Sequence, residues 1–317
     1  MPLSLSIRTL TKADLEAADV VVREAYNVPS NAPGGKARLQ RYLTLQPDGW
    51  FLAVLDGKFV GLVGAIDYGP FAYIGLMSVS PSVQRRGIGR VLMTHLIAWL
   101  DGRACPSALL DATPVGAPLY ELFAFIEDDK TAQWHNISLH SHEREALAAR
   151  AAFVNAYGSY NIDASFMLPE PLYSPVARQL SLLQSAEIPD LAAFDKQYFG
   201  ASRANVFASL LSDYPQAAFV VRDENGHISG YLFKQARTIG PWVASTPEDA
   251  ETLLRHVLAL PFFGAYSVNV SVANQHASRL LSHYGFRQQR VLSHMRRGHA
   301  PLRDRTKLYA QTSFALG

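Results

Sequence analysis

The chain has 317 residues, of which 49% are hydrophobic and 18% charged, a balance that favours a globular fold over disorder and leaves room for two domains. The formal net charge is only +2, and no cluster of five or more Lys and Arg occurs, so nucleic acid is not expected as a partner. Cys105 is the only cysteine, which excludes internal disulfides and thiolate-rich zinc or iron–sulfur clusters.

The first residues have no apolar segment followed by a small-residue cleavage site, and no stretch approaches 18 uninterrupted apolar residues. The sequence therefore predicts a cytoplasmic protein with no membrane segment. A reducing compartment also agrees with the single cysteine.

Strand and helix signals alternate along the N-terminal half. Leu5–Arg8 alternates like a strand, and Thr11 with Asp14 forms a capping box that opens a helix to about Glu24. Further expected elements follow in this order: a helix at Arg38–Leu45, strands at Trp50–Leu55, Phe59–Asp67 and Tyr73–Val79, a helix at Gly87–Leu100, a strand at Ala108–Ala112 and a helix at Pro118–Phe125.

The second half repeats this order of elements. Its expected elements are a strand at Leu180–Leu183, a helix at Pro189–Phe194, a hairpin of Ala218–Arg222 and Ile228–Arg237, a helix at Pro247–Leu258, a strand at Ser267–Val272 and a helix at Gln275–Tyr284. A shift of 161 residues places Gly89 on Ala250 and also Phe125 on Phe286 with no gap between them. One register serving both positions indicates an internal duplication.

These patterns predict two domains with a connector and a tail. Residues 1–144 form the first domain and 176–300 the second. Residues 145–175 are the linker, which begins as a helix at Glu145–Val154 and becomes proline-rich. Residues 301–317 form a tail in which Lys307–Phe314 alternates weakly like an edge strand.

One junction between a strand and a helix has the composition of an anion site. Glycines at 87 and 89 allow close backbone approach, the helix N-terminus presents N–H groups, and Arg85, Arg86 and Arg90 add positive charge. The natural ligand of such a junction is a pyrophosphate. A bare Gly-x-Gly is also compatible with a tight turn that has no ligand.

The residues around this junction resemble a known family signature. The run Gln84-Arg85-Arg86-Gly87-Ile88-Gly89 resembles the Gln/Arg-x-x-Gly-x-Gly/Ala motif of the GNAT superfamily of N-acetyltransferases. Residues 110–125 look like the fifth strand and following helix of that superfamily, with Ala124 in place of the usual Gly. The resemblance covers roughly residues 5–135, and it implies acetyl-CoA (coenzyme A) as the acyl donor.

The resemblance also implies roles for individual positions. The strand containing Met77, Ser78 and Val79 is expected to diverge from its neighbour and to hold pantetheine and the acetyl carbonyl through free backbone groups. The pyrophosphate is expected on Gln84, Arg85, Arg86, Gly87, Ile88, Gly89 and Arg90. Tyr120 is expected near the thioester sulfur, as the acid that protonates the departing thiolate. The alternative interpretation of Tyr120 is a core aromatic residue.

Direct transfer to an amine also needs a general base, and the sequence does not single one out. The strand at 73–79 contains no carboxylate, so the base is either a carboxylate elsewhere, with Asp67 and Asp111 as candidates, or acts through water. Both aspartates also suit a turn or a strand end. His135, His140 and His142 lack a third ligand at metal spacing, so no metal is expected.

At the shift of 161 residues, the second half lacks the signature residues of the first half. Gln84, Gly87 and Gly89 fall on Ser245, Glu248 and Ala250, and Tyr120 falls on Leu281, which predicts a degenerate site that binds no cofactor. The second half resembles the C-terminal domain of a bacterial tandem GNAT family. The implied fold is α/β: two tandem GNAT-like domains, each a mixed, mostly antiparallel sheet flanked by helices.

The acceptor site is the least defined part of the prediction. Asp195 and Arg203 either face an acceptor or pair with each other. Aromatic residues are further candidates for an acceptor cavity at the domain junction, although most aromatic residues are core: Tyr26, Trp50, Tyr68, Phe199 and Trp242.

A small-molecule primary amine is the expected acceptor, because the low net charge gives no sign of a large polyanionic one. Two alternatives remain: an acyltransferase of the thiol-cofactor type, and a non-catalytic acetyl-CoA sensor. The sequence leaves open whether the chain forms a homodimer.

Overall fold

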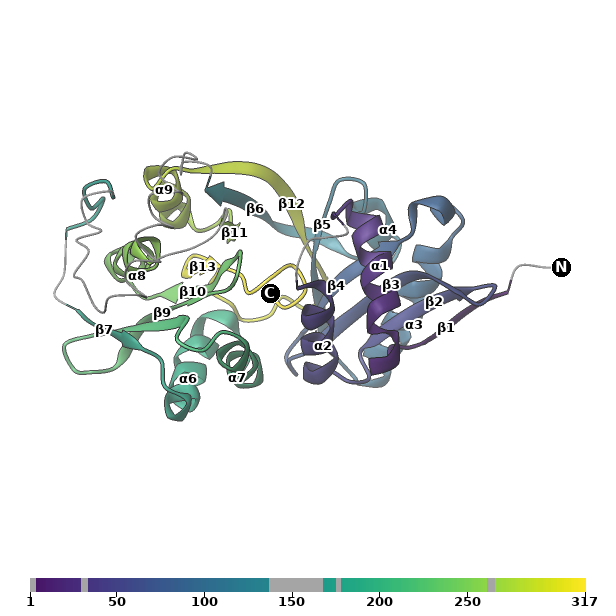
Figure 1. Ribbon diagram of the computed structural model, residues 1–317, viewed down its shortest axis with the longest axis horizontal. Coiled ribbons are helices and arrows are strands. Elements are labelled where there is room, and N and C mark those ends of the chain that lie inside the picture. The colour runs from purple at the N-terminus through teal and green to yellow at the C-terminus, as the bar shows by residue number, and fades with distance from the viewer. Residues whose placement is uncertain (1–3, 30–33, 137–167, 175–177, 261–265) are drawn as a thin grey trace, which may run out of the picture. The chain divides into compact units, whose positions relative to one another are not determined.

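The computed structural model describes residues 4–29, 34–136, 168–174, 178–260 and 266–317. The chain divides into two compact units (Figure 1). Unit 1 comprises Met1–Asp129, Ser293–Leu302 and Ser313–Gly317, and unit 2 comprises Lys130–Leu292 and Arg303–Thr312. The division differs from the predicted one, because residues 293–302 and 313–317 return to unit 1. The helix expected at Glu145–Val154 lies outside the described residues.

Unit 1 contains the elements that the sequence patterns predict. They are β1 (Leu5–Thr9), α1 (Leu15–Tyr26), α2 (Gly35–Leu45), β2 (Trp50–Leu55), β3 (Lys58–Asp67), β4 (Ala72–Val79), α3 (Ile88–Gly102), β5 (Ser107–Ala112) and α4 (Ala117–Glu121). The predicted capping box of Thr11 and Asp14 is present on the short 3₁₀ turn before α1. The predicted β2–β3 turn is confirmed by the positive φ of both Asp56 and Gly57.

Two long strands cross the boundary between the units along the chain. β6 (Ile126–Asn136) begins in unit 1 and ends in unit 2, and β12 (Phe286–Gly298) begins in unit 2 and ends in unit 1. Neither was predicted as a strand. In unit 1 the strand order is β1-β2-β3-β4-β5-β12, and every neighbouring pair is antiparallel except β4 with β5.

One face of this sheet holds the principal apolar core of unit 1. Side chains of α3 such as Leu92 and Leu96, both 0% exposed, pack on alternate residues of β4 and β5. Tyr73 and Gly75 alternate with these core residues and therefore project from the other face of β4, whereas Met77, which follows the positive-φ residue Leu76, packs partly buried against the core. Helix α1 contacts β3 and β4.

Unit 2 repeats the order of unit 1 from strand to strand and helix to helix. Its elements are β7 (Gln179–Leu182), α6 (Ile188–Phe199), α7 (Ala204–Asp213), β8 (Ala218–Arg222), β9 (Ile228–Lys234), β10 (Ile239–Ala244), α8 (Pro247–Ala259), β11 (Ser267–Ser271), α9 (Gln275–His283) and β13 (Leu308–Ala310). Helix α7 and the strand β10 were not predicted from the sequence. The order of the repeat places β10 with β4, α8 with α3, β11 with β5 and α9 with α4.

The two strand ladders of unit 2 are separate. One sheet has the order β13-β10-β9-β8-β7 and is antiparallel throughout, while β11 pairs with β6. The tail residues 307–314, predicted as an edge strand, contribute only the three residues of β13, which are 6% exposed or less.

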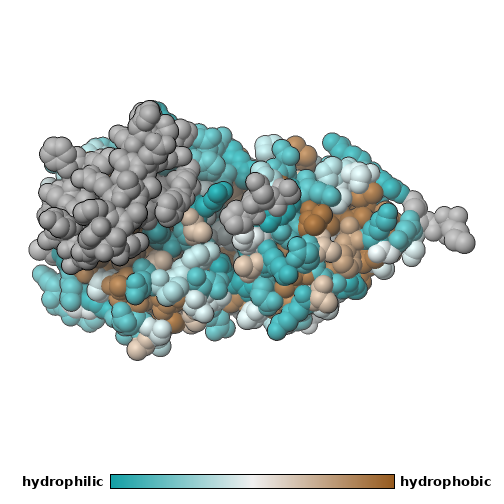
Figure 2. Space-filling view, viewed as in Figure 1, coloured by the Kyte–Doolittle hydropathy of each residue, from teal (hydrophilic) through white to brown (hydrophobic). Residues whose placement is uncertain are grey.

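No helix among the described residues is long and apolar enough to cross a membrane. On the face shown in Figure 2, brown apolar residues are interrupted by teal polar ones. Single exposed apolar side chains, such as Val115 and Leu302, are normal on a protein surface.

Candidate functional site

The centre of the candidate site is the point at which β4 and β5 diverge. The two strands pair at Ala72 with Ala108 and at Tyr73 with Leu109, and the described residues show no ladder between them beyond these pairs. Leu76 has a φ of +56°, and the register of β3 against β4 shifts between Leu62 and Gly64. A bulge of this kind turns the strand away from its neighbour, so backbone groups of β4 beyond Tyr73 are available to a ligand.

The loop predicted to bind an anion follows directly at the end of β4. The side-chain amide of Gln84 donates to the Val79 carbonyl at 3.0 Å, which closes the loop on the strand. Gly87 has a φ of +82° at the N-cap of α3, where no side chain caps the helix. The first N–H groups of a 15-residue helix are therefore available to an anion.

Positive charge surrounds this helix N-terminus. Arg85, Arg86 and Arg90 are exposed, and within the described part of the chain none of them forms an ion pair. A Cβ added to Gly89 would lie 3.3 Å from Leu119 and 4.0 Å from Val79, so the glycine keeps open the place where α3, α4 and β4 meet. Of the predicted pyrophosphate residues, all are exposed or partly exposed except Ile88, whose side chain is buried in the core.

Tyr120 on α4 borders the same place. It is 8% exposed, and its ring contacts Phe125 edge-on with centroids 6.1 Å apart. Burial raises the pKa of its phenol well above the ordinary value, so the neutral, proton-bearing form persists at physiological pH. No described residue makes a hydrogen bond to its hydroxyl. Ala124, where the family usually has Gly, adopts a φ of +63°, so the turn keeps its left-handed shape despite the substitution.

Tyr26 at the end of α1 is near Tyr120 and touches β4. Its hydroxyl donates to the carbonyl of Met77 at 3.0 Å, and its side chain is 48% exposed. The presence of Tyr26 also contributes to the raised pKa of Tyr120, after burial. Of the predicted acceptor residues, Tyr26 is the one that is both exposed and next to the cofactor strand.

Asp111 lies on β5 two residues past the last pair with β4. Its carboxylate accepts a short hydrogen bond from the Tyr73 hydroxyl and lies 3.0 Å from Nδ1 of His294. The side chains of Asp111 and His294 are 0% and 1% exposed. Tyr73, Asp111 and His294 form a buried polar cluster, which we call the β5 cluster.

His294 was not identified from the sequence. It stands on β12 directly opposite Asp111 in the ladder, 183 residues further along the chain. No motif surrounds it, so only the pairing of β12 with β5 brings it to the site. An imidazole oriented by a carboxylate is a common arrangement for proton transfer.

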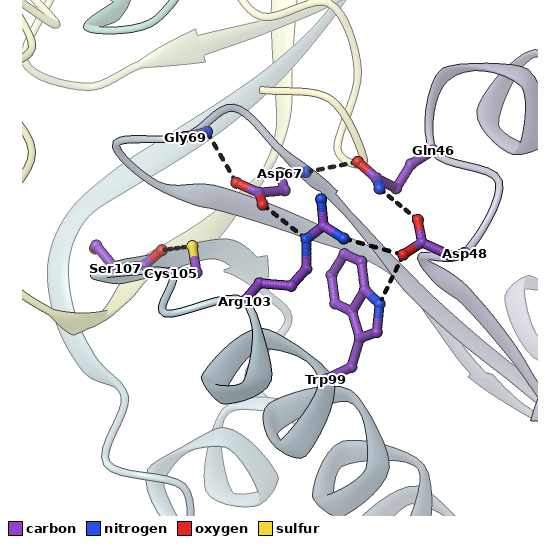
Figure 3. A network of polar contacts seen from close by, with 8 residues as sticks. All are labelled: Gln46, Asp48, Asp67, Gly69, Trp99, Arg103, Cys105 and Ser107. Carbon is purple, nitrogen blue, oxygen red and sulfur yellow. Dashed lines mark hydrogen bonds and ion pairs between the residues drawn. The ribbon is translucent and has the colours of Figure 1, made fainter.

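Asp67 is engaged at the other end of the sheet (Figure 3). Its carboxylate accepts from Nε of Arg103 at 2.9 Å and from the backbone N–H of Gly69 at 2.8 Å. Arg103 also donates to Asp48 at 3.0 Å, and Trp99 adds a hydrogen bond to Asp48 at 3.2 Å. This network connects the C-terminal end of α3 to the β3–β4 turn. The carboxylate of Asp67 is therefore already hydrogen-bonded within the structure.

The structure buries both tryptophans that the sequence suggested for an acceptor cavity. Trp50 is 0% exposed, stacks on Tyr42 at 5.1 Å and donates its indole N–H to the Tyr42 carbonyl. Trp242 is also 0% exposed and packs on Tyr309 at 4.9 Å. Each belongs to the core of its own unit, so neither side chain lines a cavity.

Asp195 and Arg203 pair with each other inside unit 2. The two side chains are 0% and 1% exposed, with Oδ1 of Asp195 2.6 Å from Nη2 of Arg203. Tyr231 donates to Asp195 at 2.6 Å, and Phe199 packs on the guanidinium at 3.8 Å. The sequence left open whether these residues face an acceptor or pair with each other, and in the structure they form an ion pair.

The described histidines show no metal-binding arrangement. No group of three His, Cys, Asp or Glu residues in the described ranges could hold a metal ion. His135 lies on β6, and His140 and His142 lie outside the described residues.

Unit 2 lacks the counterpart of the anion site. Helix α8 begins at Pro247 with Thr246 as N-cap, whose hydroxyl accepts from the N–H of Asp249 at 3.2 Å. Glu248 and Asp249 occupy the first turn. Asp249 is buried and pairs with Arg178 at 2.6 Å. The Thr246 cap and the Glu248 carboxylate disfavour a pyrophosphate at this helix start, in contrast to the three arginines of unit 1.

Comparisons with known proteins agree with this geometry. A model of the acetyltransferase (GNAT) family matches residues 18–125, and a model of a second acetyltransferase (GNAT) domain matches residues 191–310. An uncharacterized N-acetyltransferase, YitH, of Bacillus subtilis (strain 168) is 24% identical over 209 residues, which are 65% of this chain and 62% of that relative. The match therefore spans less than two thirds of the relative.

Solved structures share the fold over the whole chain. A candidate acetyltransferase from Pyrococcus horikoshii superposes with a TM-score of 0.77 at 24% identity, covering 99% of this chain and 96% of that one. A GCN5-related N-acetyltransferase from Sphaerobacter thermophilus has a TM-score of 0.62 at 14% identity, covering 97% and 98%. At these identities the likeness establishes the fold.

The buried pair of unit 2 gives a first prediction. Replacing Asp195 by Ala leaves the Arg203 guanidinium buried without its carboxylate, which typically costs about 3–5 kcal/mol. We expect unit 2 to unfold at lower urea concentration, as followed by hydrogen exchange of β9. Lys196→Ala, on the exposed side of the same helix, is the control and should change stability by less than about 0.5 kcal/mol. An Asp195→Ala protein of wild-type stability with a raised acceptor KM would return Asp195 to the acceptor site.

Proposed function

Because the chain belongs to the GNAT family of acetyltransferases, we propose that it transfers the acetyl group of acetyl-CoA directly to the primary amine of a small molecule. The observation that carries the proposal is the continuity of the unpaired β4 backbone, the open N-terminus of α3 and the Tyr120 hydroxyl within unit 1. The enzyme is a transferase. The proposal of direct transfer to a small amine rests on the chemistry of these groups.

The residues of unit 1 suit the pyrophosphate, the pantetheine arm and the thioester of acetyl-CoA. The N–H groups of Ile88 to Arg90 and the exposed arginines would hold the pyrophosphate, and β4 beyond Tyr73 would pair with the amides of the pantetheine arm. Bound acetyl-CoA would supply an acyl thioester. Backbone donors on the diverging strand would then stabilise the negative charge that develops on the acetyl oxygen.

Two groups on opposite sides of β4 suit the proton transfers. Tyr120, whose pKa is raised by burial, keeps its proton and can give it to the departing thiolate. The β5 cluster is our candidate for the base: Asp111 orients the imidazole of His294, which accepts the proton of the ammonium directly or through water. Asp67 is the weaker candidate, since Arg103 and Gly69 already occupy its carboxylate.

The acceptor would bind on the α1 side of β4. Tyr26 is exposed there, and Ala315 packs over Gly75, where an added Cβ would come within 2.3 Å of its side chain. Residues 313–317 therefore reduce the space above the middle of β4, which favours a compact acceptor. The small net charge of +2 agrees with a small amine more than with a large polyanion.

An amine panel assayed for CoA release tests the proposal against its alternatives. Transfer to one class of small amine supports it. Tight CoA binding without turnover on any amine would favour an acetyl-CoA sensor, and turnover only with an amine of a thiol-cofactor precursor would favour the biosynthetic acyltransferase.

We predict that one chain binds one CoA. Gly87→Glu places a carboxylate at the N-cap of α3 and strains a backbone at φ +82°, so calorimetry should show affinity reduced at least about 100-fold. Gly226→Ala is the matched control for backbone strain, because Gly226 has a φ of +81° and open space around it. A stoichiometry near two, or unchanged affinity in Gly87→Glu, would contradict the prediction.

Replacing Tyr120 by Phe removes the proton and keeps the ring in its contact with Phe125. Turnover should fall by about 10²–10⁴-fold, while CoA affinity and the melting temperature change little. Since burial raises the pKa of Tyr120, its ionisation should not lower the wild-type rate below about pH 10. Turnover within a factor of about three of wild type would restore the interpretation of Tyr120 as a core aromatic.

Replacing Asp111 by Asn tests the base. The amide cannot stabilise a charged imidazolium on His294, so kcat/KM for an amine that is protonated at the assay pH should fall by about 10²-fold or more. The loss should be smaller for an acceptor amine of low pKa, which needs less help to deprotonate. Asp101→Asn, on the exposed end of α3, is the control. An equal loss for both amines would indicate a structural role for Asp111.

A further inference from the structure

Unit 2 contains the same strand divergence as unit 1. β10 and β11 correspond to β4 and β5, and a single parallel bridge between Thr238 and Ser267 joins the two chain segments where those strands begin. Beyond that bridge β10 and β11 have no ladder with each other among the described residues. A divergence inside a core leaves backbone N–H and C=O groups that need partners.

A strand from the end of the chain fills this divergence. β13 pairs antiparallel with β10, with Trp242 opposite Ala310 and Val243 opposite Leu308, and it packs against β11 and α9. The N–H of Gln311 donates to the Asn269 carbonyl of β11 at 2.9 Å. β13 thus lies between β10 and β11, as the labels in Figure 1 show.

The fit of β13 in this place is close. Tyr309 is 1% exposed and packs on Trp242. Gly240 on β10 has a φ of +137°, and a Cβ added there would lie 2.1 Å from the Gln311 carbonyl oxygen. The backbone of β10 therefore meets the backbone of the tail with no room for a side chain.

A second segment of the chain lies against the two helices of this divergence. The carboxylate of Glu251 on α8 accepts from the backbone N–H groups of Leu172 and Tyr173 at 2.6 and 2.8 Å. Arg255, also on α8, donates to the Pro169 carbonyl at 2.5 Å. We call residues 168–173 the docked strap.

Helix α9 holds the other side of the docked strap. Nε2 of His283 lies 2.7 Å from the Glu170 carbonyl, and Nδ1 of His276 lies 2.8 Å from the Tyr173 hydroxyl. The helices α8 and α9 correspond to α3 and α4, which in unit 1 carry the anion loop and Tyr120. The backbone of the docked strap is thus hydrogen-bonded to both helices.

We propose that unit 2 has kept the cofactor groove and filled it with its own chain, with β13 in the place of pantetheine and the docked strap between the two helices. This inference rests on the proposed function for the identity of the groove. The occupant is permanent: β13 uses the backbone groups of β10, and the start of α8 has a Thr246 cap and the Glu248 carboxylate, which disfavour the diphosphate that would have to replace the strap. Unit 2 is therefore a self-occupied copy of the site.

Hydrogen exchange with and without CoA tests the inference on the full chain. In the wild type, CoA at millimolar concentration should slow exchange in residues 84–92, and amides in 168–173 and 308–312 should be protected already without it. In the Gly87→Glu variant unit 1 should bind CoA weakly, so the same titration removes any effect transmitted from unit 1. The exchange rates of residues 168–173 and 308–312 in this variant should not change when CoA is added. A CoA-dependent change in either segment of that variant would overturn the inference.

Glu251→Ala tests the strap separately. It removes the acceptor of two backbone N–H groups, so the amides of Leu172 and Tyr173 should exchange at least about ten-fold faster while α8 and CoA stoichiometry stay unchanged. Glu224→Ala, an exposed glutamate of the β8–β9 hairpin, is the matched control and should have no effect.

The outcomes separate the two proposals. A second CoA bound by Glu251→Ala would show that the strap covers a working site and would overturn the inference. Unchanged exchange at Leu172 and Tyr173 in Glu251→Ala would overturn it as well. If CoA did not slow hydrogen exchange of residues 84–92 in the wild type, that result would count against the proposed function. The exchange rates of residues 168–173 and 308–312 would still decide the inference.

Discussion

The structure depends on the divergence of a parallel strand pair. β4 and β5 meet at two residue pairs and then separate, which leaves backbone groups of β4 without ladder partners on that side; the Met77 carbonyl accepts from the Tyr26 hydroxyl instead. Unpaired backbone groups in a protein interior are costly, so such a gap persists only where a ligand or another segment completes it. The Leu76 bulge lies on β4 itself, the loop after Val79 leads from it into α3, and Tyr120 on α4 packs in the same core.

The two halves of the chain complete the gap in different ways. Unit 1 places glycines, arginines and an uncapped helix N-terminus at its mouth, which suits an anionic cofactor. Unit 2 places Thr246, Glu248 and Asp249 there and supplies β13 as the missing strand. In unit 2 a peptide strand provides the hydrogen-bond partners of β10, so this strand needs no ligand to complete it.

Buried charge has a different role in each unit. In unit 2 the Asp195–Arg203 pair has its hydrogen bonds satisfied by Tyr231 and Thr312, as a structural ion pair requires. In unit 1 the β5 cluster lies beside the diverging strands, and in our proposal it accepts a proton. Both groups of side chains are buried, so burial does not distinguish their roles. They differ in position, because only the β5 cluster includes residues of the two diverging strands.

The sequence by itself predicted the duplicated order of elements and the loop that joins β4 to α3, because capping boxes, turn glycines and apolar periodicity are local signals. The observed helix starts align Gly87, the N-cap of α3, with Thr246, the N-cap of α8, whereas the shift of 161 residues aligned it with Glu248. The sequence did not predict β6, β10 or β12, and so it could not place His294 opposite Asp111, 183 residues away. Only the tertiary structure decided that Trp50 and Trp242 are core, that Asp195 pairs with Arg203, and that β13 enters unit 2. These outcomes depend on pairing between distant segments, for which a single sequence carries no local pattern.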